Sequence, residues 1–127
     1  MPLATLTVRR PKTAAFKSQV LTAVQRALTT AGVPEADLFQ RVLELEADDF
    51  PFDPQYPDAA TPRDANFVLI EILLSVGRSV KIKRKILESL IGDLAREAGL
   101  DPEHVMVVFK ETSWENWAFA GGRILHA

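Results

Sequence analysis

The stretch SVKIKRKILESLIGDLAREAGL, residues 79–100, carries the pattern that decides the fold. Its apolar residues recur at helical spacing and form one stripe, which comprises Ile82, Ile86, Leu87, Leu90, Ile91 and Leu94. Ser79 is suited to cap the start of this helix, and Gly99 follows its end. The nearly continuous apolar run before it, Phe67 to Ser75, is typical of a strand buried on both faces. Val105 to Phe109 follows the helix and predicts another strand.

The same order of elements occurs earlier in the chain. Residues 2–9 are rich in β-branched side chains and predict a strand, and residues 38–45 predict a second one. Between them Thr13 can cap a helix whose apolar residues recur every four positions, at Phe16, Val20, Val24 and Leu28. Shifted by 66 positions, these residues align with the stripe of the later helix. The chain therefore reads as a tandem β-α-β repeat.

We expect one domain over residues 1–127, with repeat units at about 2–45 and 66–110 and a tail over 111–127. A right-handed crossover in each unit places both helices on one face of a single sheet. The prediction is an α+β fold with a four-stranded mixed sheet and a short strand near Arg123-Ile124-Leu125. The other sheet face is apolar and no predicted helix covers it, so we expect an oligomer whose sheets face each other.

The connection between the two units, residues 46–65, contains many prolines and aspartates. Prolines at this density exclude a long helix or a central strand. Three aromatic residues stand among them, namely Phe50, Phe52 and Tyr56. A loop of this length is usually either functional or mobile. The aromatic side chains favour packing onto a neighbouring element over full disorder.

Composition excludes several classes of function. The formal net charge of −2 argues against nucleic acid as the main partner, because phosphate binding requires a basic surface. The chain has no cysteine, which excludes disulfides and thiolate chemistry and fits a reducing cytoplasm. Its most apolar run, Phe67 to Leu74, is short and contains Glu71, so we expect no membrane span. His104 and His126 lack the companions of a metal site.

Four short stretches carry a resemblance to a known family. The chain begins Met1-Pro2, and three internal stretches read VPEADLFQ over 33–40, GRS over 77–79 and NWAFAGG over 116–122. A duplicated β-α-β unit that begins Met-Pro resembles the tautomerase superfamily. The internal stretches are similar to the group that includes malonate semialdehyde decarboxylase. The resemblance implies a homotrimer with its sheets around a central barrel.

Pro2 is the first candidate catalytic residue. A residue this small at the second position allows Met1 to be removed, which leaves a secondary amine at the start of a strand. Burial lowers the pKa of such an amine because it disfavours the charged form, and an amine with a pKa near neutrality suits proton transfer at carbon. The resemblance implies that Pro2 acts as general base and general acid.

Arg78 is the candidate that binds a substrate carboxylate. It lies directly before a predicted helix, where free N–H groups and the helix dipole favour an anion, and arginine matches carboxylate geometry bidentately. The resemblance assigns this role to the arginine of that turn. The lysines that follow are read as a solvated basic face. One departure from the decarboxylase pattern is Val76, which stands where that enzyme has a second arginine.

The remaining candidates lie in the other two stretches. Asp37 either activates a water or accepts a proton, or else it is a turn residue, which is a common use of aspartate. Gln40 is a possible polar contact. Trp117 and Phe119 are expected to form the pocket wall, where they exclude water, or to pack in the core or at a subunit interface.

These residues predict a cytoplasmic enzyme without cofactor or metal that acts as a tautomerase of small 2-oxo or enol carboxylic acids. Two alternatives remain open. One is decarboxylation or hydration of a 3-oxo or unsaturated acid, with a cationic Pro2 as the acid and Asp37 activating water. The other is a non-catalytic trimeric binding protein, which follows if Met1 is retained and the Pro2 nitrogen stays an amide.

Overall fold

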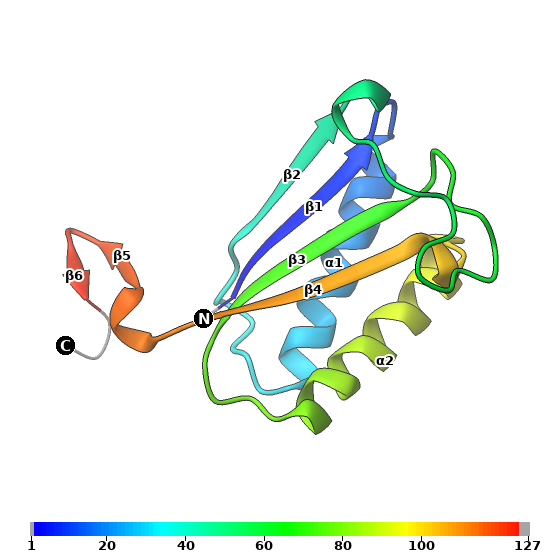
Figure 1. Ribbon diagram of the computed structural model, residues 1–127. Coiled ribbons are helices and arrows are strands. Elements are labelled where there is room, and N and C mark those ends of the chain that lie inside the picture. The colour runs from blue at the N-terminus through cyan, green and yellow to red at the C-terminus, as the bar shows by residue number, and fades with distance from the viewer. Residues whose placement is uncertain (1, 125–127) are drawn as a thin grey trace.

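The computed structural model describes residues 2–124, which form two β-α-β units and a C-terminal hairpin (Figure 1). The first unit comprises β1 (Leu3–Arg9), α1 (Ala14–Thr30) and β2 (Gln40–Leu45), and the second β3 (Val68–Ser75), α2 (Val80–Glu97) and β4 (Val105–Thr112). Short 3-10 turns follow as η1 (Ala47–Asp49), η2 (Pro102–His104) and η3 (Trp114–Asn116). The tail ends in β5 (Ala118–Ala120) and β6 (Arg123–Ile124). Leu125 of the predicted last strand lies outside the described residues.

The four long strands form one mixed sheet in the order β2-β1-β3-β4. Strands β1 and β2 run parallel, as do β3 and β4, while β1 and β3 pair antiparallel and join the two units. The predicted α+β fold with its four-stranded mixed sheet is therefore confirmed. The antiparallel pairing brings the start of β1 to the same end of the sheet as the ends of β3 and β4 (Figure 1).

Both helices begin and end as the sequence predicts. The hydroxyl of Thr13 accepts a hydrogen bond from Phe16 N at 3.0 Å, and Ser79 accepts from Ile82 N at 3.2 Å. At the other end of α2, Gly99 adopts φ +63°, and the Leu100 amide then donates to Leu94 O at 3.1 Å.

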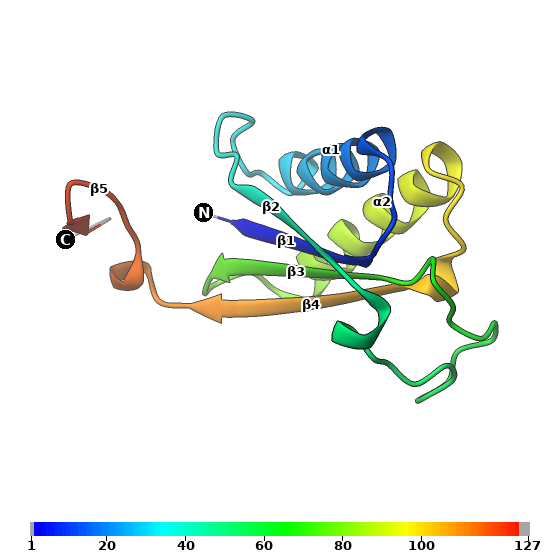
Figure 2. The same cartoon turned by 90° about the horizontal axis from the view of Figure 1, so that it is seen from above.

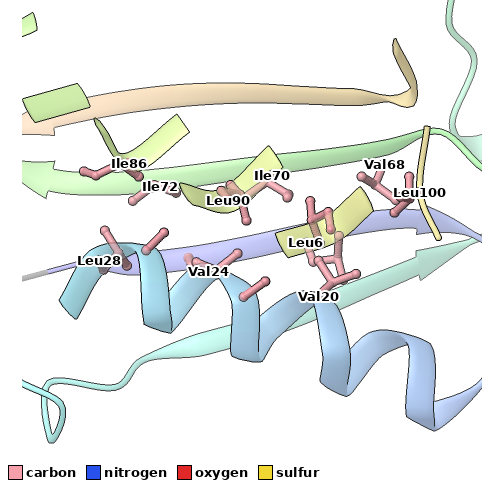
Figure 3. Packing of buried hydrophobic residues seen from close by; sticks show 14 of the residues in the cluster. Leu6, Val20, Val24, Leu28, Val68, Ile70, Ile72, Ile86, Leu90 and Leu100 are labelled. Atoms are coloured by element: carbon pink, nitrogen blue, oxygen red, sulfur yellow. The ribbon is translucent and has the colours of Figure 1, made fainter. Parts of the chain in front are cut away.

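The core lies between the helices and one face of the sheet (Figures 2 and 3). Alternate residues of the strands meet the helix stripes there, and the largest buried side chains include Leu6, Val20, Val24, Leu28, Val68, Ile70, Ile72, Ile86 and Leu90. These side chains belong to both repeat units, so neither unit buries its apolar face without the other. Truncating one of them to alanine is expected to cost about 2–5 kcal/mol of stability.

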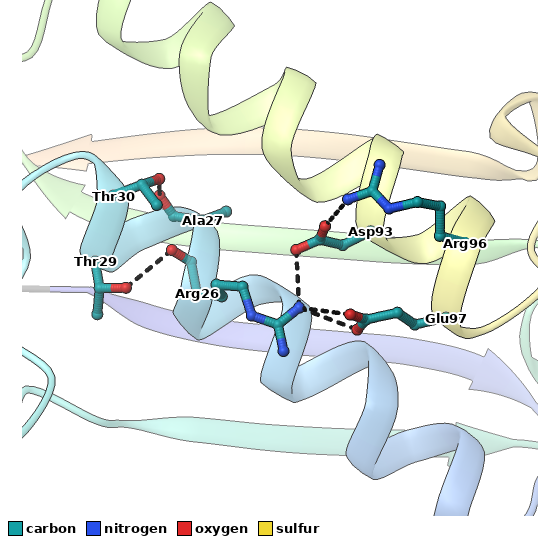
Figure 4. Close-up of polar contacts among 7 residues, drawn as sticks. All are labelled: Arg26, Ala27, Thr29, Thr30, Asp93, Arg96 and Glu97. Carbon is teal, nitrogen blue, oxygen red and sulfur yellow. Dashed lines mark hydrogen bonds and ion pairs between the residues drawn. The ribbon is translucent and has the colours of Figure 1, made fainter.

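A cluster of charged side chains, here called the clamp, connects the two helices (Figure 4). The guanidinium of Arg26 on α1 lies 3.0 Å from Asp93 and 3.0 Å from Glu97 on α2, and Arg96 also pairs with Asp93. Asp93 is buried, so these charge-assisted bonds satisfy a carboxylate that would otherwise be costly to bury. The clamp joins residues that are 67 positions apart in the chain.

The opposite face of the sheet is not covered by a helix (Figure 2). It exposes Leu43 and Met106 at 42% and 48% beside a polar row across the strands. In that row Arg41 Nε donates to Thr5 Oγ1 at 2.9 Å, and Glu71 pairs with Lys110. The uncovered face is therefore mixed rather than apolar throughout as the sequence predicted, because Arg41, Glu71 and Lys110 place charges on it.

The loop between the units packs at the end of the sheet opposite to Pro2 (Figure 1). Phe50, Phe52 and Phe67 form a cluster with ring centroids 4.5 to 5.9 Å apart. The guanidinium of Arg9 lies 4.0 Å from the centroid of Phe52 and donates to Phe50 O at 3.0 Å. Phe50 and Phe52 thus hold the loop against the strands, whereas Tyr56, which was also expected to pack, is 76% exposed. Within one chain the loop does not reach the N-terminal end of β1.

Glu44 on β2 predicts a pH dependence of stability. Its carboxylate accepts hydrogen bonds from Lys17 Nζ at 2.8 Å and from the Lys12 amide at 2.9 Å, and these bonds hold its pKa below the usual value for glutamate. A carboxylate with a lowered folded-state pKa stabilises the fold fully above its unfolded pKa, and this contribution is lost as the pH falls through the folded value. We expect Glu44→Gln to lower Tm at neutral pH, with the difference from the wild type disappearing in acid.

Thermal melts between about pH 3 and pH 7 measure this difference. Glu46→Gln is the matched control, because its carboxylate is exposed and pairs with the exposed Arg10. A Glu44→Gln curve that stays parallel to the wild-type curve down to the lowest pH would contradict the prediction.

Candidate active site

Pro2 lies at the end of the sheet where β1 begins and where β3 and β4 end (Figure 1). The residue is buried. The Ala4 amide donates to Phe39 O at 3.0 Å, so it points toward the segment that precedes β2. Continued by two residues, the parallel register that pairs Ala4 with Gln40 sets Pro2 beside Leu38, in that same segment.

Asp37 lies in the segment beside Pro2. The Asp37 amide donates to Pro34 O at 3.0 Å, which makes a turn. Gln25 on α1 holds this turn, because its Nε2 donates to Glu35 O at 3.2 Å and to Asp37 O at 3.3 Å. The half-buried Asp37 is thus positioned by backbone contacts beside the start of β1.

Three aromatic rings stack next to this turn. Phe39 lies 5.4 Å from Phe119, and Phe119 stacks on Trp117 with centroids 5.5 Å apart and an interplanar angle of 6°. An open hollow of about 220 Å³ lies between Pro34, Asp37, Phe39 and Phe119. The C-terminal tail therefore closes onto the segment before β2 and gives that hollow an apolar wall.

Phe39 is a member of this group that the sequence reasoning missed. Its alternation with Arg41 and Leu43 placed it in a strand, and nothing local indicated an aromatic partner 80 positions later. The sequence feature that could have identified Phe39 as a site residue is its place between Asp37 and Gln40, in a stretch that carries the family resemblance. The side chain is 48% exposed, which leaves it accessible to a ligand.

Gln40 lies apart from these rings. Its Nε2 donates to Leu21 O on α1 at 2.8 Å, and the residue lines a separate hollow of about 430 Å³ between α1 and β2. The structure thus places Gln40 where it ties the first residue of β2 to the helix.

Arg78 lies in the turn between β3 and α2. Gly77 before it adopts φ +118°, a left-handed conformation that glycine tolerates best, and Ser79 after it caps the helix. Arg78 is half-buried and makes no hydrogen bond or ion pair with another residue between 2 and 124. Lys83, by contrast, pairs with Glu111 at 2.6 Å. Arg78 is therefore a cation near a helix N-terminus with capacity left for an anion.

The described residues 2–124 contain no group of three or more histidine, cysteine, aspartate or glutamate side chains that could hold a metal ion. His104 lies by the loop at the other end of the sheet, with Nε2 3.1 Å from Pro62 O. His126 lies outside the described residues. In the same part of the chain, neither helix is long and apolar enough to cross a bilayer.

The arrangement combines groups suited to acid-base chemistry on an anion. Pro2 is buried beside a carboxylate-bearing turn, and aromatic rings bound the space next to that turn. Arg78, which has no side-chain partner among residues 2–124, follows β3. A family model described as tautomerase enzyme matches residues 37–120, which include Asp37, Arg78, Trp117 and Phe119. The chain belongs to this tautomerase family.

A probable tautomerase and two solved structures are similar to this chain. The probable tautomerase YusQ of Bacillus subtilis (strain 168) is 27% identical over 99 residues, which are 78% of this chain and 76% of that protein. The crystal structure of malonate semialdehyde decarboxylase is similar with a TM-score of 0.86 at 28% identity, over 96% of this chain and 93% of that one. Native fused 4-OT, at 18% identity and a TM-score of 0.77 over 96% and 94% of the two chains, shares the fold.

Proposed function

We propose that this tautomerase-family protein interconverts the keto and enol forms of small 2-oxo carboxylic acids without a cofactor, with Pro2 carrying the proton after Met1 is removed. The observation that carries the proposal is the position of Pro2. It is buried at the end of the sheet where the Asp37 turn and the aromatic hollow also lie. Burial beside apolar rings lowers the pKa of an amine, which keeps a fraction of it uncharged near neutral pH.

The proposed reaction divides the work between two residues. Arg78 binds the substrate carboxylate bidentately and orients the acid. The uncharged Pro2 nitrogen removes a proton from C3, the C–H electron pair forms the C2=C3 bond, and the carbonyl electron pair moves onto the C2 oxygen. The protonated amine then gives the proton to that oxygen and yields the enol. The reverse sequence converts the enol to the keto acid. Trp117 and Phe119 exclude water from the amine.

Proton NMR tests the proposal. Enol phenylpyruvate or 2-hydroxymuconate is mixed with the protein, and the appearance of the keto form is followed against the buffer rate. We expect catalysis of this step. The mass of the intact purified protein provides the second test, because the mechanism requires the loss of one methionine residue. A protein that retains Met1 has an amide at Pro2, which is the state expected of the non-catalytic trimeric binding protein.

Decarboxylation or hydration of a 3-oxo or unsaturated acid is the second candidate. It is favoured by the similarity to malonate semialdehyde decarboxylase, at 28% identity over nearly the whole chain. In this reaction a cationic Pro2 acts as the acid and Asp37 activates water. The side chain of Val76 argues for the tautomerase, because it leaves Arg78 as the single arginine of the turn from Ser75 to Ser79.

Val76→Arg is therefore expected to shift the protein toward decarboxylation. Val76 is 43% exposed, so the longer side chain fits without disturbing the core. A second cation beside Arg78 stabilises the charge that develops as CO2 leaves, and one such group typically contributes 10²- to 10³-fold. Release of CO2 from a 3-oxo acid, followed by NMR, measures the gain. Val80→Arg, at the exposed first residue of α2, is the control, and an equal gain there would contradict the prediction.

We further propose that the chain forms a homotrimer in the cytoplasm, with the uncovered sheet faces turned toward one another. The exposed Leu43 and Met106 on that face support this, because a contact between subunits removes their apolar surface from water. The fused 4-OT that shares the fold at 22% identity is a symmetric trimer. Light scattering is expected to give three times the chain mass, and a monomeric mass would contradict the proposal.

A further inference from the structure

Ser75, the last residue of β3, has a hydroxyl group without a partner. The residue is 0% exposed, and its Oγ makes no hydrogen bond within the part of the chain that the structure describes. Buried polar atoms in native proteins are nearly always paired, and an unpaired one is commonly explained by a missing ligand or water. Among residues 2–124 the other such atom is Nε1 of Trp117, which follows β4 at the same end of the sheet.

The register of the strands places Ser75 next to Pro2. Leu3 pairs with Leu73 across β1 and β3, so the register continued by one residue sets Pro2 opposite Leu74, and Ser75 follows Leu74 directly. Along the chain Ser75 stands three residues before Arg78. Ser75 is therefore near the proposed proton carrier in the sheet register and near the proposed carboxylate anchor along the chain.

The neighbours of Ser75 do not use its hydroxyl. Thr112 is its register partner on β4, and the Thr112 hydroxyl already accepts a hydrogen bond from Asn116 Nδ2 at 2.7 Å. Val76, the next residue, donates its amide to Thr112 O at 2.9 Å and has an apolar side chain. Ser75 thus keeps one O–H donor for a group that enters from outside the described fold.

We infer that Ser75 is a catalytic residue that donates a hydrogen bond to the C2 oxygen of the substrate. The inference rests on the proposed function. A 2-oxo acid with its carboxylate at Arg78 and its C3 at the Pro2 nitrogen has its C2 oxygen between these two groups. Negative charge develops on that oxygen when Pro2 removes the C3 proton. A donor fixed there before the reaction stabilises the charge without reorganisation. Ser75 keeps its own proton throughout.

Ser75→Ala tests the inference by separating activity from stability. We expect kcat for enol ketonisation to fall by about 100-fold, the cost of removing one such donor, while KM stays within about twofold. Tm is expected to stay unchanged or to rise, because alanine removes an unpaired buried polar group. A hydroxyl that served only the fold would not give this combination.

Thr7→Val is the matched control. Thr7 is also a buried hydroxyl residue on the uncovered side of the sheet, but it lies five residues along β1 from Pro2, roughly 16 Å away. It is expected to keep wild-type kcat. Pro2→Ala, measured in the same assay, distinguishes a failure of the role of Ser75 from a failure of the proposed function.

The outcomes are separate. If Pro2→Ala is inactive and Ser75→Ala keeps kcat within twofold, the role of Ser75 is wrong and the proposed function stands. If Pro2→Ala keeps its activity, the proposed function is wrong and the inference falls with it. If Ser75→Ala loses activity together with a fall in Tm of more than about 5 °C, or if Thr7→Val loses as much activity, Ser75 is structural and the inference is overturned.

Discussion

Replacing Pro2 with alanine is expected to lower kcat/KM for enol ketonisation by about 10²- to 10⁴-fold, the range supplied by a positioned acid-base group. The alanine amine that remains after Met1 removal lacks the ring that fixes the nitrogen at the start of β1. Its position and its pKa therefore both change. Pro2 precedes the first paired residue of β1, so the variant is expected to keep the circular dichroism spectrum and Tm of the wild type.

A second form of the protein tests the nitrogen itself. A cleavable peptide left on the N-terminus keeps the Pro2 ring but converts its nitrogen into an amide. We expect this form to be as inactive as Pro2→Ala and to recover full activity when a protease releases the peptide. An extended protein that is as active as the processed one would contradict base catalysis by Pro2.

The pH profile adds an independent measurement. The base must be uncharged, so kcat/KM is expected to rise with pH through the pKa of the Pro2 amine and then to level off. The rising limb is expected to be absent from the residual activity of the extended form.

The second large effect is expected at Arg78. Arg78→Ala removes the cation proposed to bind the substrate carboxylate, and hydrogen bonds to charged groups are worth about 1.5–3 kcal/mol. The corresponding loss in kcat/KM is about 10- to 150-fold, mostly through KM because the carboxylate is bound in the ground state and the transition state alike. Steady-state kinetics on the same enol measures this division.

Two variants serve as controls for Arg78. Arg78→Lys keeps the charge but loses the bidentate geometry, and it is expected to fall between the wild type and Arg78→Ala. Lys81→Ala removes a neighbouring exposed cation of α2 and is expected to change kcat/KM less than threefold, as a solvated charge would. Equal losses at Lys81 and Arg78 would show a general effect of positive charge and would contradict a specific carboxylate contact.

Much of the fold follows from local features of the sequence. The stripes of α1 and α2, the capping hydroxyls of Thr13 and Ser79, and the turn at Gly99 act within a few residues of one another, so they can be read from spacing alone. The likeness of the two halves then implies the duplicated unit. Residues 105–109 predict a strand that the structure extends to Thr112, because strand ends depend on the neighbour that pairs with them.

The sequence by itself determined the tandem β-α-β architecture, the family resemblance that the comparisons confirm, and the choice of Pro2, Asp37, Arg78, Trp117 and Phe119 as candidates. Only the tertiary structure decided that Phe39 meets Phe119, that Gln40 turns to α1, and that Ser75 is buried without a partner. The physical reason is the sequence separation between the residues that make each contact. Helix stripes and caps are satisfied within one turn, whereas contacts between residues tens of positions apart depend on strand order and register, which exist only once the two units have paired.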